Sequence, residues 1–139
     1  MLLTDLEKGS HIYLNLTATR ECVTVSQITD NSIEVTNGKD YIPITGSDMF
    51  HMLEGIRLTR YILYENGFHR ENLSVYGQPF ENVFVKLQKD SQDIYLREDN
   101  DNFLLILPSS GNDLDCSFIS LPFVHIAQKY FSINYNSIL

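Results

Sequence analysis

Short alternating runs of apolar residues, separated by turn-forming residues, limit this chain to folds built from small antiparallel sheets. In the first half, such runs cover residues 11–16, 22–28, 33–36 and 39–42. Alternation over four to eight residues is typical of strands that bury one face. Four short strands with tight turns predict a small curled sheet or partial barrel, which resembles an SH3-like barrel in shape.

The connection at Asn37-Gly38 carries the clearest turn signal of the first half. It joins two strand-like runs, and both residue types tolerate a positive φ. We therefore expect a type I′ hairpin there. The following segment, from Ser47 to Gly55, fits either one or two helical turns with Ser47 as the cap and Gly55 as the stop, or an irregular covering segment.

The second half predicts a meander of antiparallel strands. Its apolar runs cover residues 82–88, 93–97 and 102–107, and residues 116–119 add an edge strand. Residues 98–101 are predicted to form a turn, and the overlapping stretch Asp99-Asn100-Asp101-Asn102 is superficially similar to a calcium-binding loop. This stretch lacks the glycine and the closing glutamate of an EF-hand, so we interpret it as a hairpin turn.

A first short helix is predicted over residues 59–67. Thr59 is a good N-cap because its hydroxyl can accept a hydrogen bond from a free backbone N–H. Gly67 suits the left-handed position after a helix end, where Phe68 can pack on Leu63. A helix of about two turns does not persist alone, so it must dock on a sheet.

A second helix is predicted over residues 121–132, with Ser120 as its cap and Pro122 in its first turn. Apolar residues recur along it at helical spacing and predict a face that packs on a sheet. We place His125 and Gln128 on the polar side of this helix, with His125 hydrogen-bonded at the edge of the sheet.

Together these elements predict an α+β fold in a single domain over residues 1–139, with both helices packed on antiparallel sheet. Its expected parts are an N-terminal strand unit (about 10–45), a helix (about 59–67), a meander (about 80–120) and a C-terminal helix (about 121–132).

The net charge argues against two classes of binding partner, and the cysteine content indicates the cellular compartment. The chain has 10 basic and 18 acidic residues and a net charge of −8, which argues against binding to nucleic acid or to an anionic membrane. It has no apolar run of the roughly 18 residues that a membrane span needs, and we expect no signal peptide. Cys22 and Cys116 fit no CxxC pattern and are expected to be small buried thiols, so we predict a cytoplasmic protein.

Catalytic and metal-binding patterns are missing from the sequence. The four histidines, His11, His51, His69 and His125, show no HxxxH or HExxH spacing, and no P-loop, GxSxG or GxGxxG occurs. We therefore expect no catalytic residues, no metal site and no cofactor.

We expect the partner to be another protein, contacted by Arg60 and Tyr64 if these remain exposed, because Arg and Tyr are enriched at such contacts. For the aromatic residues Tyr61, Tyr64 and Phe68 we expect a place in the core between helix and sheet, with an exposed binding stripe as the alternative.

Two phrases of the sequence resemble a known family. LEGIRLT followed by IL and GF, at residues 53–68, resembles the phrase YEPIPLTEEILLKCGF of small uncharacterised proteins of Bacteroidetes phages and mobile elements. FVHIAQKYF, at residues 123–131, resembles that family's closing YVHQLQNLYFAL. The resemblance spans most of the chain and implies no catalytic residues. The family's Pro-x-Pro before the helix is absent here, and Arg60-Tyr61 replaces its Glu-Glu.

These observations favour a non-enzymatic protein-binding or assembly module encoded by a phage or mobile element. An alternative is an acidic inhibitor that occupies the nucleic-acid site of a host defence protein, which clustering of Asp and Glu on one face would favour. A second alternative is a small enzyme whose site is assembled in space around His125 or His69. The sequence selects no oligomeric state.

Overall fold

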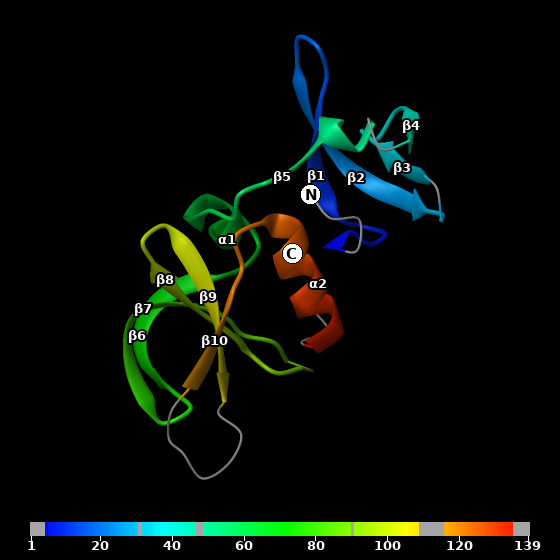
Figure 1. Ribbon diagram of the computed structural model, residues 1–139. Helices are drawn as coiled ribbons and strands as arrows, with labels where there is room; N and C mark the ends of the chain where they lie inside the picture. The colour runs from blue at the N-terminus through cyan, green and yellow to red at the C-terminus, as the bar shows by residue number, and fades with distance from the viewer. Residues whose placement is uncertain (1–4, 31, 47–48, 90, 109–115, 135–139) are drawn as a thin grey trace. The chain divides into compact units, whose positions relative to one another are not determined.

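The computed structural model describes residues 5–30, 32–46, 49–89, 91–108 and 116–134 (Figure 1). Within them the chain forms two five-stranded antiparallel sheets and two short α-helices. It divides into two compact units, one made of Met1–Arg57 with Phe123–Tyr130 and the other of Leu58–Pro122 with Phe131–Leu139. The predicted α+β class with antiparallel sheets and two short helices is confirmed, and the single-domain organisation stays a prediction.

The sheet of the first unit has the strand order β4-β3-β2-β1-β5. A single turn of 3-10 helix, η2, precedes the last strand, which returns to pair with β1. Alternate residues of these strands form a buried apolar cluster, as the sequence pattern predicts. The elements are β1 (His11–Asn15), β2 (Arg20–Ile28), β3 (Ser32–Thr36), β4 (Tyr41–Thr45), η2 (Met49–Met52) and β5 (Leu53–Gly55).

The helix α2 (Val124–Asn134) begins in the first unit. Its Gln128 side chain is buried and makes two hydrogen bonds to the chain just before and at the start of β1. The Gln128 Oε1 accepts from the backbone N–H of His11 at 2.8 Å, and its Nε2 donates to the carbonyl of Gly9 at 3.1 Å. These bonds satisfy the amide of Gln128 and fix this part of α2 beside β1.

The second unit consists of the helix α1 and a sheet with the strand order β10-β9-β8-β7-β6. Residues of one face lie opposite one another in the register and are buried: Phe84 pairs with Leu96, and Leu96 with Leu105. On α1, Leu63 is fully buried and the Tyr64 ring lies 5.7 Å from that of Phe84. The elements are α1 (Arg60–Glu65), β6 (His69–Val75), β7 (Gln78–Lys86), β8 (Ile94–Asp99), β9 (Asn102–Pro108) and β10 (Cys116–Ser120).

The other face of this sheet is also apolar, because the sheet curls on itself (Figure 1). Val75, Val83, Val85 and Ile106 form a second buried cluster there. The two edge strands approach each other, since the Cys116 thiol donates to the carbonyl of Val75 at 3.7 Å. Curling therefore buries a second apolar face without a further layer of helices.

Several local expectations need correction. Of Asn37-Gly38, only Gly38 has a positive φ, of 96°. The Asn37 side chain instead accepts hydrogen bonds from the backbone N–H groups of Lys39 and Asp40, so the turn is longer than type I′. Ser47 lies outside the described residues, and Gly55 belongs to β5 rather than ending a helix. 

The final helix begins four residues after its expected cap. Ser120 is the last residue of β10 and Val124 the first of α2. The residues between them are held in extended pairings: the N–H of Leu58 donates to the carbonyl of Pro122, and the N–H of Val124 donates to that of Ile56. Backbone pairing with a distant segment thus replaces the predicted first turn.

Candidate functional site

The helix α1 begins and ends as its capping residues predict. The backbone N–H of Ile62 donates to the Thr59 hydroxyl at 3.3 Å, which confirms the N-cap. At the other end, Gly67 has a φ of 89°, and the N–H of Phe68 donates to the carbonyl of Leu63 at 3.0 Å. This is the hydrogen bond of a Schellman ending. The short helix therefore holds its side chains at fixed positions on the second unit.

The outer side of α1 presents aromatic rings. Tyr61 and Tyr64 are 69% and 47% exposed, whereas Leu63 is fully buried. One edge of Tyr64 contacts the core through Phe84, so its ring is fixed while its outer part faces solvent. Rigid, half-exposed tyrosines are common at protein contacts because they offer a large area at low entropic cost.

Arg60 is already engaged within the unit. Its guanidinium donates from Nε to Oε2 of Glu98 at 2.7 Å and from Nη2 to Oε1, forming a two-point ion pair with β8. Hydrogen bonds from Arg60 hold the pKa of Glu98 below its usual value, with smaller electrostatic contributions from Arg60 and Arg70. Arg60 thus neutralises Glu98. The partner-binding role of Arg60 and Tyr64 stays a prediction.

An open pocket of about 450 Å³ lies next to Glu98, where β7 and β8 part. The pairing of these strands runs from Lys86–Ile94 to Val83–Arg97 and ends there. The pocket lining comes from β6, β7 and β8. It consists of Arg70, Pro79, Phe80, Glu81, Asn82, Arg97 and Glu98.

A bend in β7 accounts for the parting of the strands. Asn82 has a φ of 56°, and its N–H donates to Oδ1 of Asn72 at 2.8 Å instead of to a neighbouring strand's carbonyl. The β6–β7 register shifts between Glu71 and Leu73, as at a β-bulge. Bulges bend a strand and interrupt its ladder, and they are common beside functional sites.

Two arginines of the pocket lie over aromatic rings. The guanidinium carbon of Arg70 is 5.6 Å from the ring centroid of Phe84, and that of Arg97 is 5.7 Å from the centroid of Phe118. Phe118 is 40% exposed and meets Phe80 edge-on at 6.2 Å. Among the described residues, no carboxylate lies within 4.0 Å of either guanidinium. An arginine that lies over a ring can still offer its N–H groups to a planar acceptor.

Sequence reasoning found α1 but not this pocket. Arg97 follows the buried Leu96 in an alternating strand, so its exposure was foreseeable. The pocket itself was not foreseeable, because it depends on the bend at Asn82 and on where the β7–β8 pairing ends.

In the first unit, His125 contradicts the expectation of a hydrogen-bonded edge residue. It is 3% exposed, and its buried Nδ1 has no hydrogen-bond partner among the residues that the structure describes. Its ring stacks on that of Phe123 at 5.7 Å with an interplanar angle of 14°. Burial lowers the pKa of His125. The buried side of α2 therefore includes His125 and Gln128, which were placed on the polar side.

The remaining chemistry-bearing residues form no assembled centre in the described part of the chain. No three His, Cys, Asp or Glu side chains there are arranged to hold a metal ion. Cys22 and Cys116 are unpaired thiols, but Cys22 is exposed and Cys116 half-buried, so the expectation that both are buried is wrong. His69 is exposed and pairs with Glu71 at 2.5 Å. Neither described α-helix has the length and apolar content needed to span a membrane.

Comparison with known proteins adds no assignment, because no family model, curated protein or solved structure matches the chain.

Proposed function

We propose that this protein is a non-enzymatic protein-binding or assembly module that works through the second unit. The binding region, here named the α1–pocket surface, comprises Arg60, Tyr64, Arg70, Arg97 and Phe118. These side chains are linked through Glu98, which pairs with Arg60 and lines the pocket with Arg70 and Arg97. The observation that carries the proposal is this concentration of fixed, exposed aromatic and arginine side chains, the composition typical of protein-binding hot spots.

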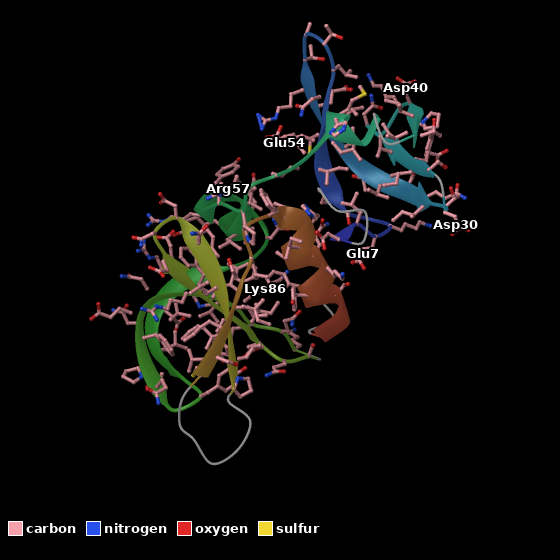
Figure 2. All side chains as sticks on the ribbon, viewed as in Figure 1. Glu7, Asp30, Asp40, Glu54, Arg57 and Lys86 are labelled. Carbon is pink, nitrogen blue, oxygen red and sulfur yellow. The ribbon has the colours of Figure 1, made fainter. Side chains whose placement is uncertain are left out.

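The acidic-inhibitor alternative has less support. Carboxylates of the first unit come from separate elements and project in different directions, as Glu7, Asp30, Asp40 and Glu54 do in Figure 2. Mimicry of a nucleic acid requires carboxylates ranged along one face at phosphate-like spacing. The scatter of these four residues favours a general protein-binding module over that alternative.

The enzyme alternative also has less support. A general base must reach substrate from a cleft. The pocket lining includes neither His125, which is buried against Phe123, nor His69, which is exposed beside Glu71.

We further infer that the first unit is an SH3-like barrel. In support, its strand order is β4-β3-β2-β1-β5, a 3-10 turn precedes β5, and β5 returns antiparallel to β1. A register irregularity in β2 between Val25 and Gln27 provides the bend that a curled sheet of this kind needs. Such a unit would serve here as the scaffold from which α2 starts.

We also propose that the chain belongs with the small proteins of Bacteroidetes phages and mobile elements that it resembles, and that it acts in the cytoplasm. The first resembling phrase contains α1 with its Thr59 cap and Gly67 ending, the part of the phrase that supplies Tyr64. The unpaired thiols of Cys22 and Cys116 suit a reducing compartment.

The test is quantitative co-purification of the tagged protein from cells of the organism that encodes it, followed by mass spectrometry. We expect one protein in stoichiometric amount, and at least a tenfold lower recovery with Tyr64→Ala. Tyr41→Ala is the matched control, since Tyr41 is a 66% exposed tyrosine of the first unit. Recovery that is equal for both variants contradicts the assignment to the second unit. Turnover of a metabolite by the purified protein contradicts a non-enzymatic role.

A further inference from the structure

The pocket between β7 and β8 has a charge that is unusual for this chain. The protein carries a net charge of −8 and has only five arginines. Two of them, Arg70 and Arg97, line this pocket, and a third, Arg60, pairs with Glu98 of the lining. Arg60 neutralises Glu98, which leaves Arg70 and Arg97 against Glu81 in the lining and makes the pocket locally positive.

The two pocket arginines are positioned to donate hydrogen bonds to an acceptor group of another molecule. Each is held over an aromatic ring, so little side-chain freedom remains to be lost on binding. Within the described residues neither has a carboxylate partner at ion-pair distance. Arginine donates two parallel N–H bonds to a carboxylate, and this geometry makes it the preferred residue for such recognition.

The size and apolar flank of the pocket favour a peptide over a small free anion. A volume of about 450 Å³ exceeds what a single phosphate or carboxylate fills. Phe80 lines the pocket and contacts Phe118, which is 40% exposed, so apolar ring surface lies directly beside the charged groups. An extended segment can place an acidic side chain on Arg97 and an apolar one on these rings, because Arg97 lies over Phe118.

We propose that the β7–β8 pocket binds an acidic segment of the partner protein, with an Asp or Glu side chain paired to Arg97 and an apolar neighbour packed on Phe80 and Phe118. This inference rests on the proposed function and specifies which chemistry of the partner the second unit recognises.

The test is a titration followed by NMR on the full-length, isotope-labelled protein. The probes are the capped peptide Gly-Glu-Phe-Glu-Gly, the same peptide with Gln for both Glu, and inorganic phosphate. We expect saturable shifts from the Glu peptide at the amides of Phe80, Asn82 and Arg97 and at the side-chain Nε–H of Arg97. The Gln peptide and phosphate should bind at least tenfold more weakly.

Variants identify the side chain responsible. Arg97→Gln should weaken the Glu peptide at least tenfold, and Arg97→Lys should weaken it by an intermediate factor because it keeps the charge but loses the planar pair of donors. Arg20→Gln is the matched control, since Arg20 also lies over a ring, that of Tyr13 at 4.1 Å, in the first unit. A dispersed spectrum shows that each variant is folded.

Equal binding of the Glu and Gln peptides overturns the proposal, as does the absence of shifts from the Glu peptide at millimolar concentrations. Tighter binding of phosphate than of the Glu peptide also overturns it and makes the pocket a small-anion site. The proposed function is judged separately by co-purification. A partner that is lost with Tyr64→Ala but retained with Arg97→Gln refutes the pocket inference alone, whereas the absence of any partner refutes the function.

Discussion

Replacement of Gly55 by Ala tests how the first unit joins β5 to the start of α2. A Cβ at this position would lie 2.8 Å from Cδ1 and 2.9 Å from Cγ of Phe123, and 3.0 Å from Cε1 of His125. These contacts are shorter than carbon atoms tolerate. The two rings stack on each other, so neither can move away without disturbing the other. The hydrogen bond from Val124 to Ile56 holds the backbone close at 2.7 Å.

The expected loss of stability is the balance of two opposing effects on the free energy of unfolding. Overpacking of this kind costs about 1–3 kcal/mol. Replacing Gly by Ala restricts the unfolded chain and recovers about 0.4–1 kcal/mol. We therefore expect Gly55→Ala to lower the free energy of unfolding by about 1.3 kcal/mol, within a range of about 0–2.6 kcal/mol. The assay is urea unfolding followed by far-UV circular dichroism and tyrosine fluorescence, which suits a chain with eight Tyr and no Trp.

A double-mutant cycle with Phe123→Ala isolates the contact. Once the Phe123 ring is removed, the added methyl group at Gly55 has most of its space, so Gly55→Ala should become neutral or slightly stabilising in that background. If the two changes are additive to within about 0.3 kcal/mol, the close approach of Phe123 to Gly55 is not what limits this position, and the reasoning fails.

Three further perturbations have defined outcomes. Thr59→Ala removes the N-cap of α1 and should cost about 0.5–2 kcal/mol in urea unfolding, whereas Thr59→Ser should cost much less; an equal loss from both contradicts the capping role. Gln128→Leu leaves the N–H of His11 and the carbonyl of Gly9 without their partner and should cost about 1–3 kcal/mol; hydrogen exchange at His11 that stays unchanged contradicts this. Burial lowers the folded-state pKa of His125, so unfolded chains bind a proton more readily than folded ones. The stability conferred by the neutral ring is then complete above the unfolded pKa of about 6.5 and is lost as the pH falls from there to the folded pKa. His125→Leu should reduce this acid loss without destabilising the protein at pH 8, because Nδ1 has no partner; an unchanged pH profile contradicts the assignment to His125.

Local signals allowed α1 to be predicted, because a capping hydroxyl and a left-handed glycine act within a few residues. The same locality explains the strands of the meander, whose alternation reflects the buried face of β8 and β9. The type I′ turn was expected at Asn37-Gly38. A two-residue loop with two positive φ angles, 49° and 67°, forms instead at Asn100-Asp101, where tightly paired strands leave only these residues for the connection.

Features that depend on pairing with another segment of the chain were missed. The strand β6 has mostly exposed residues and little alternation, so nothing in its own sequence marks it as a strand. It forms because β7 offers it a partner across the Tyr76-Gly77 turn. The start of α2 was misplaced for the same reason, since Val124 pairs with Ile56, far away in sequence.

Local sequence signals likewise predicted one part of the candidate site but not the other. Tyr64 was predicted as a partner-binding residue because it lies on a helix whose two ends carry clear capping signals. The pocket was not, because it forms only through a bulge in the β6–β7 register and the early end of the β7–β8 pairing. Exposure of aromatic residues was also hard to foresee: Tyr61 is mostly exposed although it lies next to the core-facing positions of α1. A sequence pattern shows which residues share a face, but not which faces another layer covers.

The central claim is that a protein partner contacts the second unit at the α1–pocket surface. Site-specific photocrosslinking in living cells tests it most directly, with benzoyl-phenylalanine placed at Tyr64 or, as the matched control, at Tyr41. We expect a single crosslinked partner protein from position 64 and none from position 41. Crosslinking that is equal from both positions, or that occurs only from position 41, would contradict the claim.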